Sequence, residues 1–300
     1  MAKAVLVLAL FLVAGCSAPP GKDPLPSTSD TQSAVSTSQS SSSTASASSS
    51  ASSSTSSTEQ SAPPPDPQNV TWHLGENNTW IPSGPPPPCP DPLRLATPVD
   101  LATVTSILYP GQVRGNAFKG HGGFRFDNNT DNNVSVRIPF DAKIVRGSHA
   151  VRNGTDIDSM EGLEEQDGFE FIAPCGIMYT FGHLRRLTPE FQAVADSLPL
   201  IVGFNQTQYY NVDPPVSVHV GQLLATAVGF ENSSNVFVDW GVLDLRQPNG
   251  KTLRPEWEAY RDGFDRYAVC WLDLLPPPDD ARARALPGGA QDSGKESDYC

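Results

Sequence analysis

The sequence predicts a mainly β domain, either all-β or β-rich α+β, over residues 69–278. Short runs in this region alternate apolar and polar residues, which is the period-two pattern of strands with one buried face. Gly, Pro and Asn separate these runs, as tight turns require. Helix signals are confined to two short segments, so the predicted architecture has an antiparallel core with one or two peripheral helices.

The predicted strands lie between residues 103 and 243. They span residues 103–108, 122–126, 134–138, 143–148, 169–172, 178–183, 223–228 and 236–243. The segment Pro174-Cys175-Gly176 stands between two of these runs and predicts a hairpin turn, because Pro and Gly supply the backbone angles that turns need.

One helix is expected directly after Thr188, a residue type that favours the N-cap, because Pro189 suits the first helical position. Apolar residues then recur on one face, at Phe191, Val194, Ala195 and Leu198. A second helix is expected near Pro255. Its aromatic residues recur at helical spacing and are better explained by core packing than by ligand binding; they are Trp257, Tyr260 and Phe264.

The first 68 residues are not expected to join this domain. Residues 1–15 resemble a signal peptide, and Leu12-Val13-Ala14-Gly15-Cys16 resembles a lipobox, in which Cys16 would carry the lipid. Ordinary cleavage nearby, with Cys16 incidental, is the alternative. Residues 16–68 are rich in Ser, Thr and Pro and predict a disordered stalk, and residues 279–300 predict a disordered tail. We therefore expect an exported protein, anchored by lipid on the extracellular or periplasmic side of a membrane.

The formal net charge is −13, and no basic run appears, so nucleic acid is not expected as a partner. Such acidity suits a solvated extracellular surface. Seven Asn-x-Ser/Thr sequons suggest a host that glycosylates asparagine, which raises an archaeal source alongside a bacterial one. The candidate glycosylation sites are Asn69, Asn77, Asn128, Asn133, Asn153, Asn205 and Asn232.

Four cysteines follow Cys16, and export to an oxidising compartment predicts that they form disulfides. Four cysteines allow three connectivities. We expect Cys89 to pair with Cys270, which would join the two ends of the globular region, and Cys175 to be a buried free thiol.

Two predicted strands carry a set of residues suited to an active site. Side chains two apart on a strand share a face, so His121, Arg125 and Asp127 project together from the first strand, and Phe237 and Asp239 from the second. The remaining histidines, His73, His149 and His219, are interpreted as surface or structural residues.

The order of these segments resembles the lysostaphin/LytM zinc metallopeptidases, which contain the duplicated hybrid motif. The resemblance covers Lys119 to Leu245. It lies in a His-x-x-x-Asp strand, a Tyr-x-His-Leu strand, a Val-x-x-Gly-Gln turn and a His-x-His strand, which correspond here to His121–Arg125, Tyr179–Leu184, Val218–Gln222 and Phe237–Asp239. It implies an antiparallel LytM-like β-sandwich or half-barrel.

The resemblance also assigns roles to single residues. His121 matches the first zinc ligand, Arg125 falls on the family's Asp ligand, and Asp239 falls on the last His ligand. His183 matches a histidine that assists catalysis, and Phe237 falls on its partner histidine. An Arg side chain has only donors and cannot ligate a metal, and a Phe side chain cannot polarise water.

A catalytic zinc ion needs three protein ligands and an open position, and only His121 and Asp239 remain at matching places. Asp127 is the candidate third ligand, but the charge of Arg125 between them would repel the ion. We expect instead that Arg125 replaces the metal as the cation and bridges to Asp239 or Asp127. For His121, a glycine-flanked loop histidine without a role is the alternative.

The resemblance and these departures predict a degenerate, non-catalytic LytM-like module without a cofactor, which binds an envelope polymer or an envelope protein. The alternative is an active zinc metallopeptidase that uses His121, Asp239 and Asp127, with His183 as its acid-base group. A structural spacer or surface-layer component is a third possibility that the stalk and the sequons equally accommodate.

Overall fold

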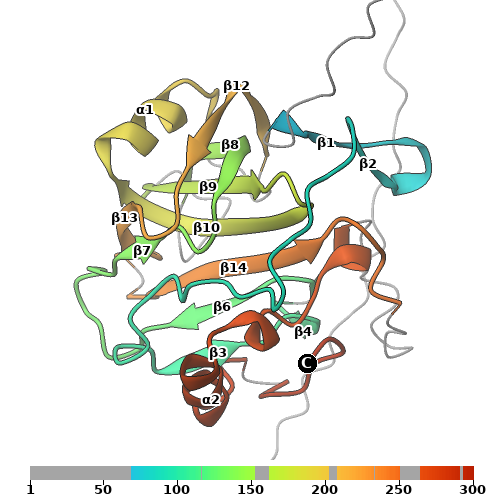
Figure 1. Ribbon diagram of the computed structural model, residues 1–300. Helices are drawn as coiled ribbons and strands as arrows, with labels where there is room; N and C mark the ends of the chain where they lie inside the picture. The colour runs from blue at the N-terminus through green and yellow to red at the C-terminus, as the bar shows by residue number, and fades with distance from the viewer. Residues whose placement is uncertain are drawn as a thin grey trace, which may run out of the picture. The chain divides into compact units, whose positions relative to one another are not determined.

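A ten-stranded, mostly antiparallel sheet organises the part of the chain that the structure describes (Figure 1). The structure is a computed structural model that describes residues 69–115, 117–152, 162–202, 208–232, 234–250, 264–290 and 293–300. All of these residues belong to one structural unit, Ser61–Cys300. The predicted β-rich fold class is therefore confirmed. Cys16 and the predicted second helix near Pro255 lie outside the described residues.

The large sheet has the order β11-β8-β9-β10-β14-β6-β3, with β12 also paired to β8, and with β13 paired to β10 and β7. Its strands are β3 (Ser106–Leu108), β6 (Gly122–Arg125), β7 (Val136–Arg137), β8 (Ala142–Arg152), β9 (Glu164–Ile172), β10 (Ile177–Leu187), β11 (Leu200–Val202), β12 (Tyr210–Val218), β13 (Leu223–Val228) and β14 (Phe237–Asp244). Within the described ranges, β11 and β8 form the one parallel pair of this sheet.

Smaller elements surround this sheet. Two further antiparallel pairs are β1 (Trp72–Leu74) with β2 (Trp80–Pro82), and β4 (Gln112–Arg114) with β5 (Ala117–Lys119). The helices are α1 (Pro189–Asp196) and α2 (Pro277–Ala285), with short 3-10 turns η2 (Glu76–Asn78), η4 (Phe264–Tyr267) and η5 (Trp271–Leu274). Among the described helices, none has the length and apolar character needed to cross a bilayer.

The hairpin between β9 and β10 forms where the sequence predicts it. The N–H of Ala173 donates to the carbonyl of Ile177, and Gly176 has a φ of +95°, a backbone angle that glycine adopts without steric cost. The predicted helix α1 also begins at Pro189. Thr188 precedes it without a capping hydrogen bond, because its hydroxyl donates to the carbonyl of Leu223 on β13 instead.

The sequence analysis missed strands β1, β2, β4, β5, β11 and β12, and it missed the first half of β9. Strand β12 contains Pro214 and Pro215, residues that normally argue against a strand because they cannot donate to a neighbour. Strand β9 begins at Glu164 rather than Phe169, because its polar first half, which reads as a loop, is largely buried in the folded protein.

Residues 279–290 and 293–300 have defined structure, which corrects the predicted disordered tail. Helix α2 covers Pro277–Ala285, and the last residue, Cys300, is covalently bound to Cys270. Tyr299 is 4% exposed and packs edge-on against Phe118. The low hydrophobicity of this segment suggested disorder, but a covalent link to the domain lowers the entropy cost of ordering it.

The expected Cys89–Cys270 disulfide is wrong. The described cysteines pair as Cys89–Cys175 and Cys270–Cys300, with Cα atoms 5.2 Å and 5.0 Å apart. Cys175 is consequently not a free thiol. Two cysteines can pair only if their Cα atoms lie within about 7 Å. The packing of the chain decides which cysteines meet this condition, and location near the two ends of a domain does not ensure it.

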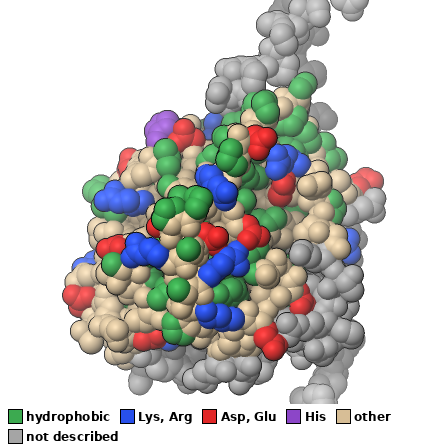
Figure 2. All heavy atoms as spheres, turned by 60° about the horizontal axis from the view of Figure 1, so that its bottom comes forward, with side chains coloured by type: hydrophobic (Ala, Val, Ile, Leu, Met, Phe, Trp, Pro, Cys, Tyr) green, Lys and Arg blue, Asp and Glu red, His purple; other side chains and the backbone are tan. Residues whose placement is uncertain are grey.

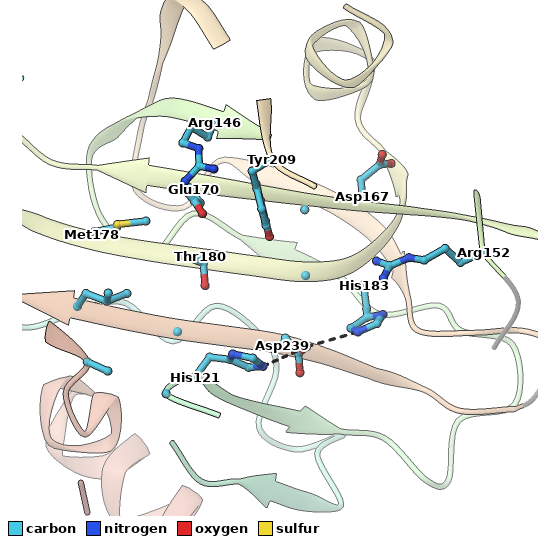
Figure 3. A pocket seen from close by; sticks show the side chains of 16 residues that line it. His121, Arg146, Arg152, Asp167, Glu170, Met178, Thr180, His183, Tyr209 and Asp239 are labelled. Carbon is cyan, nitrogen blue, oxygen red and sulfur yellow. Dashed lines mark hydrogen bonds and ion pairs between the residues drawn. The ribbon is translucent and has the colours of Figure 1, made fainter. Parts of the chain in front are cut away.

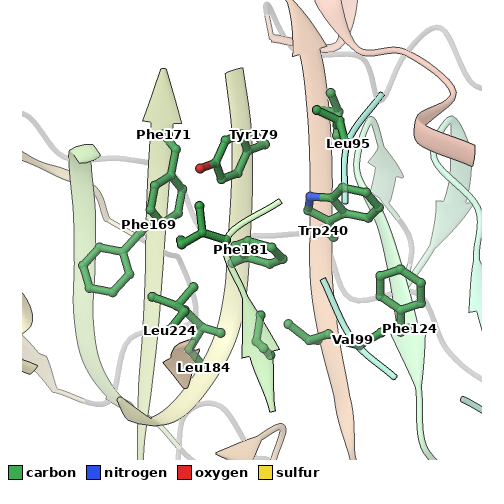
Figure 4. Close-up of a cluster of buried hydrophobic side chains, with 14 of the residues drawn as sticks. Leu95, Val99, Phe124, Phe169, Phe171, Tyr179, Phe181, Leu184, Leu224 and Trp240 are labelled. Carbon is green, nitrogen blue, oxygen red and sulfur yellow. The ribbon is translucent and has the colours of Figure 1, made fainter. Parts of the chain in front are cut away.

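The hydrophobic core lies on one face of the sheet (Figure 4). Alternate residues of β9, β10 and β14 supply aromatic side chains with 0% exposure, namely Phe169, Phe171, Tyr179, Phe181 and Trp240. The rings of Phe171 and Tyr179 stack with centroids 4.7 Å apart. Because strand side chains alternate, the residues between these aromatics point to the opposite face, and that face carries the polar pocket.

Candidate functional site

A pocket of about 440 Å³ lies on the polar face of strands β8, β9, β10 and β14 (Figure 3). Glycines on neighbouring strands leave room for it. A Cβ atom at Gly241 would lie 2.9 Å from both the Cβ atom of His121 and the Oγ1 atom of Thr180, whereas one at Gly182 would meet Asp239 at an ordinary 3.5 Å. Gly241 is therefore required for His121 to pack over the sheet.

Asp239 lies between two histidines. Its Oδ2 atom is 3.4 Å from Nε2 of His121 and 3.4 Å from Nε2 of His183, as the dashed line in Figure 3 marks. Burial raises the pKa of the Asp239 carboxyl, but the charge and hydrogen bonding of His121 and His183 outweigh burial and hold this pKa well below its usual range. Asp239 is thus an anion whose two nearest partners are imidazoles.

The backbone of β10 turns the His183 ring into the pocket. The pairing of β9 with β10 shifts register between Phe181 and Leu184, and His183 has a φ of +59°, in the left-handed region that residues with side chains rarely adopt. Such strain is often found at functional sites. The ring packs against Phe237, with centroids 4.3 Å apart, so Phe237 forms an apolar wall beside this histidine.

Gln166 fixes the orientation and the proton of His183. The Nε2 atom of Gln166 donates to the carbonyl of Gly229 at 2.8 Å, so its Oε1 atom faces Nδ1 of His183 at 2.9 Å. An amide oxygen accepts only, so Nδ1 carries a proton. A neutral His183 ring would then present a lone pair at Nε2 to the Asp239 carboxylate. The contact between them is favourable when His183 carries both protons.

Arg114 fixes the backbone at His121 through a hydrogen bond. The guanidinium of Arg114 donates to the backbone carbonyl of His121 at 3.0 Å and to that of Tyr109 at 2.7 Å. Burial lowers the pKa of Arg114, and the charge of Asp239 opposes that shift. Gly122 follows His121, and a Cβ atom there would lie 2.6 Å from Nε1 of Trp271, so the glycine permits this strand to approach its neighbours closely.

Arg125 does not reach Asp239. Its Nε and Nη2 atoms donate to Oδ1 of Asp127 at 3.0 and 2.7 Å, and Asp127 also accepts from the Thr105 hydroxyl at 2.7 Å. Burial raises the pKa of Asp127, but these hydrogen bonds outweigh burial and lower it. The expected bridge of Arg125 therefore forms to Asp127, and neither residue lines the pocket.

The opposite wall of the pocket was not predicted. On it, Nη1 of Arg146 lies 3.1 Å from Oε2 of Glu170, and the Arg146 guanidinium lies 5.6 Å from the centre of the Tyr209 ring. Burial raises the pKa of Glu170, although Arg146 opposes the shift, and burial also raises the pKa of Tyr209. Arg152 lines the same cavity. The only sequence signal for this wall is that Glu170 alternates with the aromatic core residues of β9.

The residues at the pocket do not fit a catalytic zinc ion. In the described ranges, one group of three His, Cys, Asp or Glu residues has ligand atoms all within 4.8 Å of one another, and it is His149, Glu165 and Asp167. Neither the set of His121, Asp239 and Asp127 nor the set of His121, Asp239 and His183 meets this condition, although a three-ligand zinc site needs it.

The predicted glycosylation sites are partly described. Asn69, Asn128, Asn133 and Asn232 are exposed, while Asn153 and Asn205 lie outside the described residues.

On the face shown in Figure 2, acidic and basic side chains are interspersed. Glycosylation and the expectation that nucleic acid is not a partner both stay predictions.

Comparisons with known proteins give little guidance. No family model matches the chain, and no curated protein does. A solved structure of Helicobacter pylori Csd3, from an orthorhombic crystal, aligns with 72% of this chain at 10% sequence identity and a TM-score of 0.26. The match spans 46% of that chain, less than half of its length. A similarity this low supports no assignment of function.

Proposed function

We propose that this chain is an exported, lipid-anchored envelope protein whose LytM-like domain is non-catalytic and uses its polar pocket to bind an envelope component or a partner protein. One observation carries the proposal. Both histidines that match functional positions of the zinc metallopeptidases, His121 and His183, direct Nε2 at the same oxygen of Asp239, with separations of 3.4 Å. Their imidazoles stabilise a protein carboxylate instead of a metal-bound water.

The other departures from the metallopeptidase pattern support a loss of catalysis. At the position of the family's Asp ligand, Arg125 offers only donors and is paired with Asp127. At the position of a catalytic histidine, Phe237 packs its ring on His183 and has no polar atom to orient a water molecule or to stabilise an oxyanion.

The pocket retains the properties of a binding site. Its volume of about 440 Å³ lies within the range of about 300–1,000 Å³ that small-ligand sites occupy. Donors and acceptors line it together, since Arg146, Glu170 and Tyr209 form one wall, and His121 and Asp239 form the other. Peptides and sugars also present donors and acceptors side by side, which makes a short segment of an envelope polymer or of an envelope protein a suitable ligand.

The disulfides support the extracytoplasmic part of the proposal. Disulfides between Cys89 and Cys175 and between Cys270 and Cys300 are typical of proteins that fold in an oxidising compartment. Lipid at Cys16 and a Ser/Thr-rich stalk would hold the domain clear of the membrane surface. Mass spectrometry of the mature N-terminus tests this part, because ordinary cleavage would leave an unmodified Cys16 or remove it.

The competing function is an active zinc metallopeptidase. It is favoured by the meeting of His121, Asp239 and His183 in one pocket, since the family uses residues at these positions. A third ligand would then be needed, and Asp127 could supply it only by leaving Arg125 and Thr105, which hold it at 2.7 Å each.

Binding and hydrolysis can be separated in one set of assays. The full chain is tested for hydrolysis of wall peptides with added zinc, and for binding of glycan and peptide fragments of the envelope by NMR of the histidine rings. We expect binding without hydrolysis. Hydrolysis that disappears in His121→Ala would establish the metallopeptidase instead.

A variant that fills the pocket tests where the fragments bind. Gly182→Leu adds a side chain on the pocket floor, where the first added carbon meets only ordinary contacts at 3.5 Å. We expect this variant to lose fragment binding. Val216→Leu, on exposed β12, adds bulk away from the pocket and serves as the control. Equal binding by both variants would refute the pocket as the binding site.

A further inference from the structure

A second group of titratable residues lies on the other face of the sheet. His149 on β8 is directly opposite Asp167 on β9, and Glu165 is two residues before Asp167, so strand alternation places all three side chains on one face. That face is the one carrying Phe169 and the core, whereas most residues of the polar pocket project from the other face; Asp167 itself also borders the pocket. In Figure 3 the Asp167 carboxylate points away from Asp239 and His183.

The ligand atoms of this group are already close together. Nδ1 of His149 is 2.8 Å from Oδ1 of Asp167 and 3.9 Å from Oε1 of Glu165, and all three atoms lie within 4.8 Å of one another. Two bonds of about 2.1 Å at a tetrahedral metal centre place their ligand atoms about 3.4 Å apart. The two observed separations bracket that value, so small rotations of the side chains would complete the geometry.

Asp167 has a buried carboxylate oxygen that lacks a hydrogen-bond partner within the described residues. Its side chain has 0% exposure, and its Oδ2 atom has no hydrogen-bond partner within the described residues. Burial raises the pKa of Asp167 to about 6, even though the hydrogen bond and charge of His149 oppose the shift. A buried carboxylate oxygen without a partner is rare in folded proteins and needs a physical explanation.

The surroundings are negative and ordered. Gln192 on α1 donates through Nε2 to Oε1 of Glu165 at 3.0 Å and to Oδ1 of Asp196 at 2.9 Å, so the helix positions the Glu165 carboxylate. The charges of Glu165 and Asp196 act on Asp167, and His149 forms ion pairs with Glu165 and Asp167. The Glu165 side chain is 43% exposed, which gives an ion a path from solvent.

We propose that His149, Glu165 and Asp167 bind a divalent cation of the zinc class. One imidazole nitrogen and two carboxylate oxygens are ligands that zinc accepts, and three protein ligands leave a fourth position for water. The cation would bind the neutral imidazole of His149 and the ionised carboxylates of Glu165 and Asp167. It would also be a partner for the Oδ2 atom of Asp167, which has no hydrogen bond within the described residues. Gln192 is a positioning residue. Asp167 also borders the polar pocket, but the site does not depend on the function proposed for that pocket.

The test is zinc titration of the full chain against a chromophoric chelator, with metal content measured after dialysis. We expect one zinc ion per chain and no comparable binding of magnesium. Asp167→Asn, which keeps the shape of the side chain, should weaken zinc binding more than about 100-fold, because loss even of an outer hydrogen-bond partner costs about 10–100-fold. Gln192→Ala should weaken it about 10-fold.

Two control variants assign the ion to this site. His219→Ala removes a histidine that lies 3.9 Å from Asp141 but is 79% exposed, and zinc binding should be unchanged. Asp239→Asn should also leave zinc binding unchanged, because Asp239 is not one of the three residues whose ligand atoms lie together. If zinc binding were lost in Asp239→Asn and kept in Asp167→Asn, this proposal would be wrong. That result would instead favour an active zinc metallopeptidase with its metal in the polar pocket.

Two further outcomes of the zinc titration test the proposed site. A wild-type chain that binds no zinc refutes the site while leaving the proposed function of the pocket untouched. If Asp167→Asn fails to fold, Glu165→Gln replaces it, since Glu165 is partly exposed and its loss should not disturb the core. Undiminished zinc affinity in a folded Glu165→Gln chain would then count against the proposal.

Discussion

Gly182 lies directly opposite Asp239 in the pairing of β10 with β14, and this register places His183, the next residue, within 3.4 Å of the Asp239 carboxylate. A side chain at position 182 would stand over Asp239. The glycine and the left-handed backbone at His183 together allow an imidazole to approach that carboxylate from the strand beside it.

The stability of the protein should depend on pH through Asp239. Its pKa is lowered by folding, so the stabilising contribution is present above its unfolded pKa, about 3.9, and is lost as pH falls through the lower folded value. The free energy of unfolding of the wild type should therefore exceed that of Asp239→Asn by a nearly constant amount above about pH 5, and the difference should shrink progressively as pH falls below about 4.

Urea unfolding of both proteins across this range measures the difference. Glu170 and Asp167, whose pKa values are raised by burial, contribute with the opposite sign, but they are present in both proteins and cancel in the comparison. A difference that stays constant with pH would show that Asp239 is not held as an anion by His121 and His183.

Two glycines on the pocket floor should respond differently to a single added methyl group. Gly241→Ala places a carbon 2.9 Å from the Cβ atom of His121 and should cost about 1–3 kcal/mol while displacing the His121 ring. Gly182→Ala meets Asp239 at 3.5 Å and should change the free energy of unfolding much less. Urea unfolding, together with the NMR shifts of the His121 ring, checks both outcomes; equal costs would contradict the packing described for His121.

The Arg125–Asp127 ion pair should contribute little to stability. Both side chains are partly exposed, at 29% and 47%, and exposed pairs are worth about 0.2–1 kcal/mol. A double-mutant cycle with Arg125→Gln and Asp127→Asn measures the coupling. Ligand binding at the pocket should be unaffected in either variant, because neither residue lines it; weakened binding would indicate that Arg125 acts on the pocket.

The two disulfides should stabilise the fold to different extents. Cys89 and Cys175 are separated by 86 residues, and Cys270 and Cys300 by 30, so loop-closure entropy predicts about 4.6 and about 3.6 kcal/mol. Paired Cys→Ser variants should therefore rank in that order in urea unfolding. A digest of the unreduced protein that yields a Cys89–Cys270 peptide would disprove the pairing itself.

The sequence predicted the site better than it predicted the contacts within it. Alternation selected His121 and Asp239, the family resemblance added His183, and the structure brings these three residues together. Arg125 ends strand β6, which begins directly after His121, but its guanidinium contacts Asp127 instead of Asp239. Alternation tells which face a side chain leaves from, but not which partner a long, flexible side chain will reach.

From sequence alone, the chain's strand-rich class, the turn before Gly176 and the helix after Thr188 could be determined, because each depends on residues close together in the chain. Tertiary structure alone decided the disulfide partners, the wall formed by Arg146, Glu170 and Tyr209, and the meeting of His149 with Asp167. Those contacts depend on the register between strands and on the packing of distant segments, which local patterns do not encode.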